Sequence, residues 1–337
     1  MSLEFSIRKI AQTRLLATFF FKAIPFRQKN IMNIAEIICL DKKYSTTRSL
    51  VRQIPTMESN SGDEFPTSLF MTPGEGRQGA GGLRTKGYFK RARPQKPLIT
   101  VVTVVCNGET HLESAILSVI NQTYDNIEYI IIDGASKDGT LELIRRYELT
   151  IDYWLSENDM GIYDAMNKAV TLATGDFIYF LGADDLLIAG AISKMVELIV
   201  EKMLSGTIYY GDVYMPGKHK LYDGEFTKYK LVKRNICHQS IFYPRSVFLK
   251  TRYNLCYSVL ADYELNLRLI AFMNFVYLPV LVAYYNDTGV SSSHIDSCFV
   301  RDRLKIIKDN FGKYFFYICW FRRLLGSAKS RLMAPKR

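Results

Sequence analysis

The sequence predicts an α/β protein built on a mostly parallel, doubly wound sheet with flanking helices. From residue 98 onward, short apolar runs alternate with segments of helical spacing, the pattern of consecutive strand and helix units. The apolar runs are continuous, as expected for strands that are buried on both faces. With 337 residues and 48% hydrophobic content, the chain is long enough for one large or two small domains.

Each element is predicted from its own local pattern. Strands are expected where apolar runs are bounded by turn residues, and helices where apolar residues recur three or four positions apart. The expected strands are 98–105, 127–132, 151–155, 177–181, 207–214, 241–243 and 275–285. The expected helices are 109–122, 140–147 (capped by Asp138 or Ser136), 162–173, 191–203, 262–272, 300–311 and 315–331.

Composition divides the chain into three parts. Residues 1–97 lack sustained periodicity, so we expect a basic N-terminal extension that is mostly irregular and peripheral. Residues 98–300 form the predicted domain, with 98–190 as its first half and 191–300 as its second. The remaining 301–337 segment is a basic, aromatic helical tail.

The coherent pattern begins after Met71, which leaves Met71 as an alternative start of the chain.

The distribution of charge bears on the partners. Residues 98–300 carry a net charge of −8, with +10 before them and +9 after them. A nucleic-acid binder would carry its positive charge on the folded body, so no nucleic-acid partner is expected.

The tail, the N-terminus and the cysteines indicate where in the cell the protein is expected. Aromatic and arginine residues mix in 315–325, as in a helix at an anionic membrane surface or one packed on the domain, and both interpretations stay open. No apolar run reaches the roughly 18 residues of a transmembrane helix, and the N-terminus is a poor secretory signal. The six cysteines lack metal-binding spacing and are expected as reduced thiols.

Two adjacent carboxylates, Asp184 and Asp185, follow the expected strand 177–181. Ligands of open α/β sheets bind at the carboxyl ends of strands, so the pair predicts a site of hard oxygen ligands there. Such a site suits Mg²⁺ or Mn²⁺, because one or two carboxylates can link the ion to a diphosphate. A helix cap or a solvated turn is the alternative interpretation.

Further polar residues follow the neighbouring strands. Asp133 ends the second strand, where its carboxylate could accept a base N–H or a ribose hydroxyl; a capped turn is the alternative. Gly161 precedes a helix whose N-terminal N–H groups suit an anion. Asp164 and Asn167 stand three positions apart and share a face of that helix. The first strand–helix turn lacks the G-x-G-x-x-G fingerprint of dinucleotide-binding proteins.

Four stretches, in their order and spacing, resemble an inverting glycosyltransferase of family 2 with the GT-A fold. The likeness is to the bacterial members that build cell-surface polysaccharides, and it covers residues 97–300. The stretches are the turn at Cys106-Asn107, the turn Asp133–Thr140, the block Asp159-Met-Gly-Ile-Tyr-Asp-Ala-Met-Asn-Lys168, and Gly175-Asp176 leading to Asp184-Asp185. The resemblance implies a GT-A sheet followed by a C-terminal extension on the acceptor side.

The resemblance also implies site residues. The metal ligands would be Asp185 and Asp184, although Gly182 replaces the leading acid of the family's D-x-D motif. Gly134 replaces the second acid that often follows the second strand, so Asp133 is left as the candidate for contact with the base. The full set implied for substrate binding is Asp133, Asp159, Gly161, Asp164, Asn167, Asp184, His238 and Gln239.

Inverting transfer needs a general base for the attacking hydroxyl. The family's acidic motif aligns Asp262 with that base, and Glu264 is the second candidate; a helix cap is the alternative role of Asp262. His238 is most simply a structural residue, but the family often has a polar His-Gln pair here. The segment 286–291 resembles the loop that closes over the donor.

The implied protein is a hexosyltransferase-like enzyme of class EC 2.4. It would move a sugar from a nucleotide-sugar, a UDP-sugar above all, to a hydroxyl of a glycan or lipid-linked acceptor, with Mg²⁺ or Mn²⁺. We expect it in the cytoplasm, peripheral at the inner face of the bacterial plasma membrane. A nucleotidyltransferase is disfavoured because Val105–Thr110 carries no basic residue to hold a triphosphate. A non-catalytic nucleotide-sugar binder is the remaining alternative.

Overall fold

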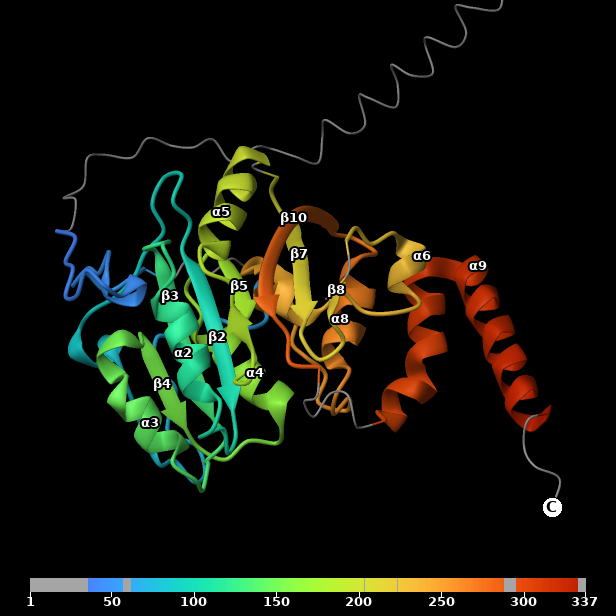
Figure 1. Cartoon of the computed structure of the whole chain (residues 1–337), viewed down its shortest axis with the longest axis horizontal. Coiled ribbons are helices and arrows are strands. Elements are labelled where there is room, and N and C mark those ends of the chain that lie inside the picture. Colours follow the sequence, from blue (N-terminus) through green and yellow to red (C-terminus); the bar gives the residue numbers. More distant parts are fainter. Residues whose placement is uncertain (1–35, 57–61, 203, 223, 288–294, 333–337) are drawn as a thin grey trace, which may run out of the picture. The chain divides into compact units, whose positions relative to one another are not determined.

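A ten-stranded mixed sheet forms the centre of the computed structural model, which describes residues 36–56, 62–202, 204–222, 224–287 and 295–332. The strand order is β1-β4-β3-β2-β5-β9-β7-β10-β6, with β8 paired to β7. Figure 1 shows β4, β3, β2 and β5 next to one another in this sheet. The strands are β1 (Gly79–Gly81), β2 (Ile99–Val105), β3 (Ile127–Asp133), β4 (Tyr153–Ser156), β5 (Phe177–Phe180), β6 (Leu186–Leu187), β7 (Thr207–Met215), β8 (Lys220–Tyr222), β9 (Ile241–Pro244) and β10 (Asn274–Tyr284).

The helices largely follow the expected periodicity. The α-helices are α2 (Leu112–Ile120), α3 (Thr140–Arg146), α4 (Ile162–Leu172), α5 (Ala191–Lys202), α6 (Lys228–Leu231), α7 (Ser246–Lys250), α8 (Ala261–Leu269) and α9 (Ser297–Leu332). The 3₁₀ turns are η1 (Ser45–Thr47), η2 (Leu83–Lys86), η3 (Glu148–Thr150) and η4 (His238–Ser240). The two helices expected in the tail form α9, which is broken at Gly312 by its left-handed φ of 82°.

The strands β4, β3, β2 and β5 are parallel, so their carboxyl ends meet at one edge of the sheet. The chain runs outward from β2 through β3 to β4 and then returns to the other side of β2 as β5. The switch point therefore lies between β2 and β5, where open α/β sheets bind ligands. The predicted α/β class and the doubly wound arrangement of the first four parallel strands are confirmed. The second half is more mixed, because β9 runs antiparallel between β5 and β7.

Helices cover both faces of the sheet. On one face, α2, α3 and α5 pack against alternate β2 and β3 residues such as Val101 and Ile131. On the other face, α4, α7, α8 and the first arm of α9 pack against residues such as Val102 and Ile130. Successive residues of a strand point to opposite faces, so these strands are buried on both sides. This explains why they appear in the sequence as continuous apolar runs.

The described part of residues 1–97 is mostly irregular, as expected, but it is not peripheral. Its strand β1 pairs antiparallel with β4 and extends the sheet. The buried guanidinium of Arg84 lies 2.5 Å from Oε1 of Glu128 in β3 and donates to the Leu172 carbonyl at 2.9 Å. A buried charge requires a partner, so this segment is part of the folded body.

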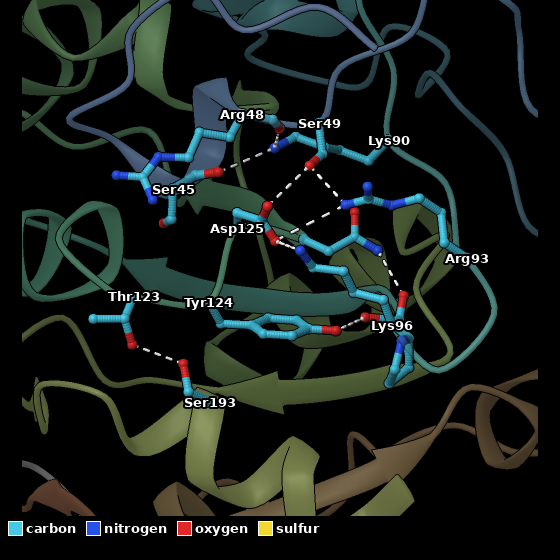
Figure 2. Close-up of polar contacts among 12 residues, drawn as sticks. Ser45, Arg48, Ser49, Lys90, Arg93, Lys96, Thr123, Tyr124, Asp125 and Ser193 are labelled. Atoms are coloured by element: carbon cyan, nitrogen blue, oxygen red, sulfur yellow. Dashed lines mark hydrogen bonds and ion pairs between the residues drawn. The ribbon is translucent and has the colours of Figure 1, made fainter. Parts of the chain in front are cut away.

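A second set of contacts anchors the same segment beside the start of β3. Figure 2 shows Arg93 donating to Oγ of Ser49 at 2.7 Å, with Asp125 accepting from Ser49 and pairing with Lys96. The Lys90 ammonium is buried and donates to the Arg48 carbonyl at 2.8 Å. Local periodicity could not predict these contacts, because they join the irregular segment to residues more than forty positions away.

Within the described residues, no helix is both long enough and apolar enough to cross a membrane.

Candidate functional site

A cavity of about 650 Å³ opens at the carboxyl edge of the parallel strands. It lies between the turn after β2, the start of α4 and the segments on either side of η4 and α8. Its lining combines apolar side chains with a few polar groups, the usual composition of a small-molecule site. The lining residues are Val104, Val105, Cys106, Asp159, Gly161, Ile162, Tyr163, Ala165, Met166, Met215, Tyr222, Asn235, Ile236, Cys237, His238, Gln239, Ser258, Val259, Leu260, Asp262 and Tyr285.

The turns after β2 and β3 hold one another in place. The Asn107 N–H donates to Oγ of Ser136 at 2.7 Å, and the Gly108 N–H donates to Oγ1 of Thr140 at 2.8 Å. Asn107 has a left-handed φ of 55°, a conformation that asparagine tolerates better than most residues. Gly139 occupies the N-cap position of α3, and of the two predicted capping residues it is Asp138 whose Oδ1 accepts the Thr140 N–H, at 3.1 Å.

The two acids after β5 differ in burial. Asp184 is exposed, and its Oδ2 accepts from Nδ2 of Asn286 at 3.0 Å. Asp185 is 1% exposed, and its Oδ1 accepts the Asn286 N–H at 2.7 Å. Burial raises the pKa of Asp185 to about 7; the Asp184 charge adds to this rise, while the nearby Gln239 side chain opposes part of it. A cation beside Asp185 would therefore favour its ionised form.

A divalent cation fits these acids. Oδ2 of Asp185 is buried and accepts no hydrogen bond from the described residues. This oxygen lies against Gly182, where an added Cβ would collide with it and come within 3.2 Å of Oδ1 of Asp184. Gly182 thus leaves open the space beside both carboxylates. Among the described residues, no cluster of three His, Cys, Asp or Glu side chains could hold a metal. A diphosphate would have to supply further ligands, as is usual for Mg²⁺.

Asp133 is placed differently from the expectation. Its carboxylate is fully buried and accepts from the Ser136 N–H at 3.2 Å, from the Ser136 hydroxyl, and from Oγ of Ser156 at 2.6 Å. These bonds join β3 to β4 and close the following turn. This geometry favours the capped-turn interpretation of Asp133 over contact with a nucleoside.

Asp159 fills the space beside that turn. Its Oδ2 lies against Gly134, where an added Cβ would collide with it, and its Oδ1 accepts the Gly161 N–H at 2.8 Å. Burial raises the pKa of Asp159, and the nearby Asp164 and Asp133 charges contribute. Both Asp159 and Gly161 line the cavity. Asp159 thus occupies the volume that a second acid at position 134 would need.

The other two polar residues of this block hold the structure together. Oδ2 of Asp164 accepts the Met160 N–H at 3.1 Å, which caps α4. The Asn167 amide forms a pair of 2.9 Å hydrogen bonds with the N–H and carbonyl of Tyr253. Neither residue lines the cavity. Their geometry favours structural roles over the predicted contact with substrate.

Asp262 lies at the cavity wall in the first turn of α8, where the helix dipole favours a negative charge. Its Oδ1 accepts from the Tyr163 hydroxyl at 2.8 Å, and its Oδ2 accepts from Nδ2 of Asn235 at 2.7 Å. Burial raises the pKa of Asp262 to about 6, although the Tyr163 hydrogen bond opposes the rise. Asp262 is therefore mainly ionised at neutral pH yet close to its titration point.

The second candidate base, Glu264, is already paired. Its two oxygens contact Nε of Arg268 at 2.5 Å and the second guanidinium nitrogen at 3.1 Å. Such a two-point ion pair engages both oxygens of the carboxylate. Glu264 is buried and does not line the cavity, so the geometry favours Asp262.

His238 and Gln239 both line the cavity but differ in availability. The His238 ring is stacked on Phe180 and shares a 2.9 Å hydrogen bond with the Tyr253 hydroxyl. Burial lowers the pKa of His238 to about 3, so the ring is neutral. Gln239 is partly exposed and lies beside Asp185. Gln239 is thus the better placed of the two for contact with a ligand.

Several cavity residues were not identified as candidates from the sequence. Tyr163 lies inside the conspicuous block 159–168 and could have been noted there. Asn235 carries no local signal, because only the fold brings it to Asp262. The apolar lining residues Met215 and Tyr222 come from strands whose function the sequence did not suggest. Of the predicted loop 286–291, residues 288–291 lie outside the described residues.

The chain is similar to known glycosyltransferases. Residues 100–252 match the family model described as glycosyl transferase family 2. The chain is 35% identical over 213 residues to the PGL/p-HBAD biosynthesis glycosyltransferase of Mycobacterium bovis, covering 61% of this chain and 83% of that protein. It is 29% identical over 213 residues to an uncharacterized glycosyltransferase of Mycobacterium tuberculosis, covering 61% and 81%.

Solved structures support the fold. The crystal structure of Staphylococcus aureus TarS 1-349 in complex with UDP superposes with a TM-score of 0.53 at 15% identity. The match covers 63% of this chain and 65% of that one, which is just under two thirds of the solved structure. TarS 1-349 in complex with UDP-GlcNAc gives a TM-score of 0.52.

Proposed function

This chain belongs to glycosyltransferase family 2, and on that premise we propose a metal-dependent, inverting transfer of sugar from a UDP-sugar to a hydroxyl of a lipid-linked glycan. The observation that carries the proposal is a cavity with one acid, Asp262, in its wall and a second, buried acid, Asp185, beside its lining residue Gln239. Asp262 lies in its wall, and the Gln239 side chain connects the same wall to the buried acid Asp185.

The donor end of the site would be held by a divalent cation. Asp185, with Asp184, would hold Mg²⁺ or Mn²⁺, which when bound would offset the charge of the donor's diphosphate. The free, buried Oδ2 of Asp185 and the open space at Gly182 support this assignment. The solved complexes of TarS with UDP and UDP-GlcNAc support a UDP-sugar as the donor.

The acceptor end is assigned to Asp262. In a single displacement, the acceptor oxygen attacks the anomeric carbon while the nucleoside diphosphate leaves with the electron pair of its bond. A positioned carboxylate takes the hydroxyl proton as the attack proceeds. A pKa of about 6 suits this task, because the group is ionised at neutral pH and still a usable base.

The acceptor class is inferred from the lining and from a relative. Apolar side chains such as Ile162, Met166 and Leu260 line the cavity around Asp262, and these suit an acceptor with an apolar portion. The relative from Mycobacterium bovis is named for PGL/p-HBAD biosynthesis. From the relative's name we take only a biosynthetic role, and we infer a hydrophobic anchor on the acceptor from the apolar lining.

Peripheral contact with a membrane is supported by a second cavity of about 460 Å³. It is lined by Val232, Lys233, Val300, Arg303, Leu304, Cys319 and Arg322, none of which is acidic. Lys233 lies 3.6 Å from the centre of the Tyr229 ring, and Arg322 donates to the same residue's hydroxyl at 3.4 Å. Helix α9 carries exposed aromatic side chains close in sequence to the cavity residues Cys319 and Arg322. They are Tyr314, Tyr317, Trp320 and Phe321. Basic and aromatic groups together suit an anionic bilayer surface.

A donor panel tests the proposed activity. Thermal melting of the full chain with nucleotide-sugars and Mn²⁺ should show stabilisation by one nucleotide class, since a ligand that binds only the folded state raises its stability. Donor hydrolysis and sugar transfer to a lipid-linked acceptor are then measured with the nucleotide-sugar that stabilises the chain. Binding without hydrolysis or transfer would favour a non-catalytic nucleotide-sugar binder instead.

A further inference from the structure

The hydroxyl of Tyr163 carries one proton and lies within hydrogen-bond distance of two acceptor oxygens. It lies 2.8 Å from Oδ1 of Asp262 and 2.6 Å from the carbonyl oxygen of Val259. A hydroxyl donates one hydrogen bond at a time but can also accept. When Asp262 is ionised, Tyr163 can donate to it. When Asp262 is protonated at Oδ1, the carboxyl can donate to Tyr163, which then donates to Val259.

The other carboxylate oxygen ends a chain of amides. Nδ2 of Asn235 donates to Oδ2 of Asp262 at 2.7 Å, and Oδ1 of Asn235 accepts from Nδ2 of Asn266 at 2.9 Å. Oδ1 of Asn266 accepts in turn from the hydroxyl of Tyr243 at 2.8 Å. An ionised carboxylate can only accept, so each amide must point its NH₂ group toward Asp262. Asn266 and Tyr243 are fully buried, which shields this chain from water.

We propose that Tyr163 and Asn235 are positioning residues that make Oδ1 of Asp262 the oxygen that receives the acceptor's proton. The amide chain holds Oδ2 as an acceptor, because protonation there would require every amide in the chain to turn. Oδ1 has a partner that serves both protonation states by rotating one hydroxyl. This proposal rests on the proposed glycosyl transfer and adds how the base is held.

The acceptor's O–H bond breaks and its proton moves to Oδ1 of Asp262, while the acceptor oxygen forms a bond to the anomeric carbon. The bond from that carbon to the diphosphate breaks, and the nucleoside diphosphate leaves with the electron pair. The Tyr163 hydroxyl turns to Val259 and keeps its own proton.

The tyrosines and the thiol around Asp262 do not titrate in the same range as Asp262. Burial raises the pKa of each neighbouring tyrosine and thiol, so all are neutral where Asp262 titrates. These groups are Tyr163 of α4, Cys237 before η4, Tyr243 of β9, Tyr253 after α7 and Tyr263 of α8. The Asp296 carboxylate accepts from the N–H groups of Val259 and Leu260, and the Glu264 carboxylate is paired with Arg268.

The test is the pH profile of kcat/KM for Tyr163→Phe and Asn235→Ala, measured in the full chain with Mn²⁺. A hydrogen bond to an ionised group favours that form, so its loss should move the acid limb upward by about one to two pH units. Tyr263→Phe is the matched control, because its hydroxyl donates to the Leu231 carbonyl at 2.6 Å and does not touch Asp262. The control should leave the acid limb where it is.

A role in packing alone would lower the rate at every pH without moving the limb. An unmoved limb in both test variants, or an equal shift in the Tyr263→Phe control, would overturn the proposal. Should one test variant fail to fold by thermal melting, the other carries the same measurement. Absence of transfer by the wild-type chain would instead refute the proposed function, so the two failures can be distinguished.

Discussion

Replacing Asp262 with asparagine should remove activity and leave the fold intact. The substituted amide can accept from Asn235 with its carbonyl and donate its NH₂ to Tyr163, whose hydroxyl then donates to Val259. The hydrogen bonds to Tyr163 and Asn235 are therefore kept, whereas the basic oxygen is lost. Loss of a general base lowers the rate by about 10²–10⁴-fold, which corresponds to roughly 3–5 kcal/mol of transition-state stabilisation.

The same change should stabilise the fold at alkaline pH. The pKa of Asp262 is raised from 3.8 to about 6, so its contribution to stability is fully present below pH 3.8 and is lost as pH rises through 6. A shift of about two units corresponds to at most about 3 kcal/mol. The substituted amide carries no charge, so Asp262→Asn should gain up to that amount relative to wild type at pH 8 and little at pH 4.

Three quantities are measured: kcat for sugar transfer from donor to acceptor, donor affinity by titration calorimetry, and the free energy of unfolding by denaturant at pH 4 and pH 8. Glu264→Gln serves as a control for the second candidate base. A near-normal kcat in Asp262→Asn would refute the assignment of the base. A variant that is less stable than wild type at pH 8 would refute the inference that the buried charge is costly.

Three further changes test other parts of the structure. Asp185→Asn should abolish the dependence of nucleoside-diphosphate affinity on Mn²⁺, because it removes the buried ligand oxygen; equal wild-type affinity in EDTA and in Mn²⁺ would rule out the metal site. The double change Lys233→Glu and Arg322→Glu should weaken co-sedimentation with anionic vesicles, since each basic residue near such a surface contributes about 1 kcal/mol. Lys194→Glu is its control on the exposed face of α5, and equal loss in both proteins would argue against a specific basic cavity. Arg84→Met should lower the free energy of unfolding by about 3–5 kcal/mol, because it leaves the buried Glu128 carboxylate without its cation. A loss below about 1 kcal/mol, measured from the denaturation midpoint, would mean that the N-terminal segment is peripheral.

Much of the sheet could be predicted because its signal is local. A strand buried on both faces needs apolar residues at nearly every position, and β2 and β3 carry that pattern in their own sequence. The short strands β1 and β6 carry no such pattern. They are strands only because β4 and β10 offer them hydrogen-bonding edges, and a local window contains no information about those edges.

The site was predicted less evenly. Position at a strand end predicted the Asp184-Asp185 pair as metal ligands, and the family resemblance suggested Asp262 as the base. The resemblance also suggested substrate contacts for Asp133 and Asn167, and the structure adds that the polar atoms of both form hydrogen bonds within the protein. The type of a residue indicates which bonds it can make, whereas the neighbours decide which of those bonds it does make.

The sequence by itself determined where the carboxylates stand relative to the strands, because strand ends and helix starts follow from local spacing. Tertiary structure alone decided which carboxylates remain available. Tyr163 and Asn235 precede Asp262 by 99 and 27 residues, and only the packing of α4 and the segment before η4 against α8 brings the three together. Burial and hydrogen bonding set the basicity of a carboxylate, and both depend on groups that are distant in the chain.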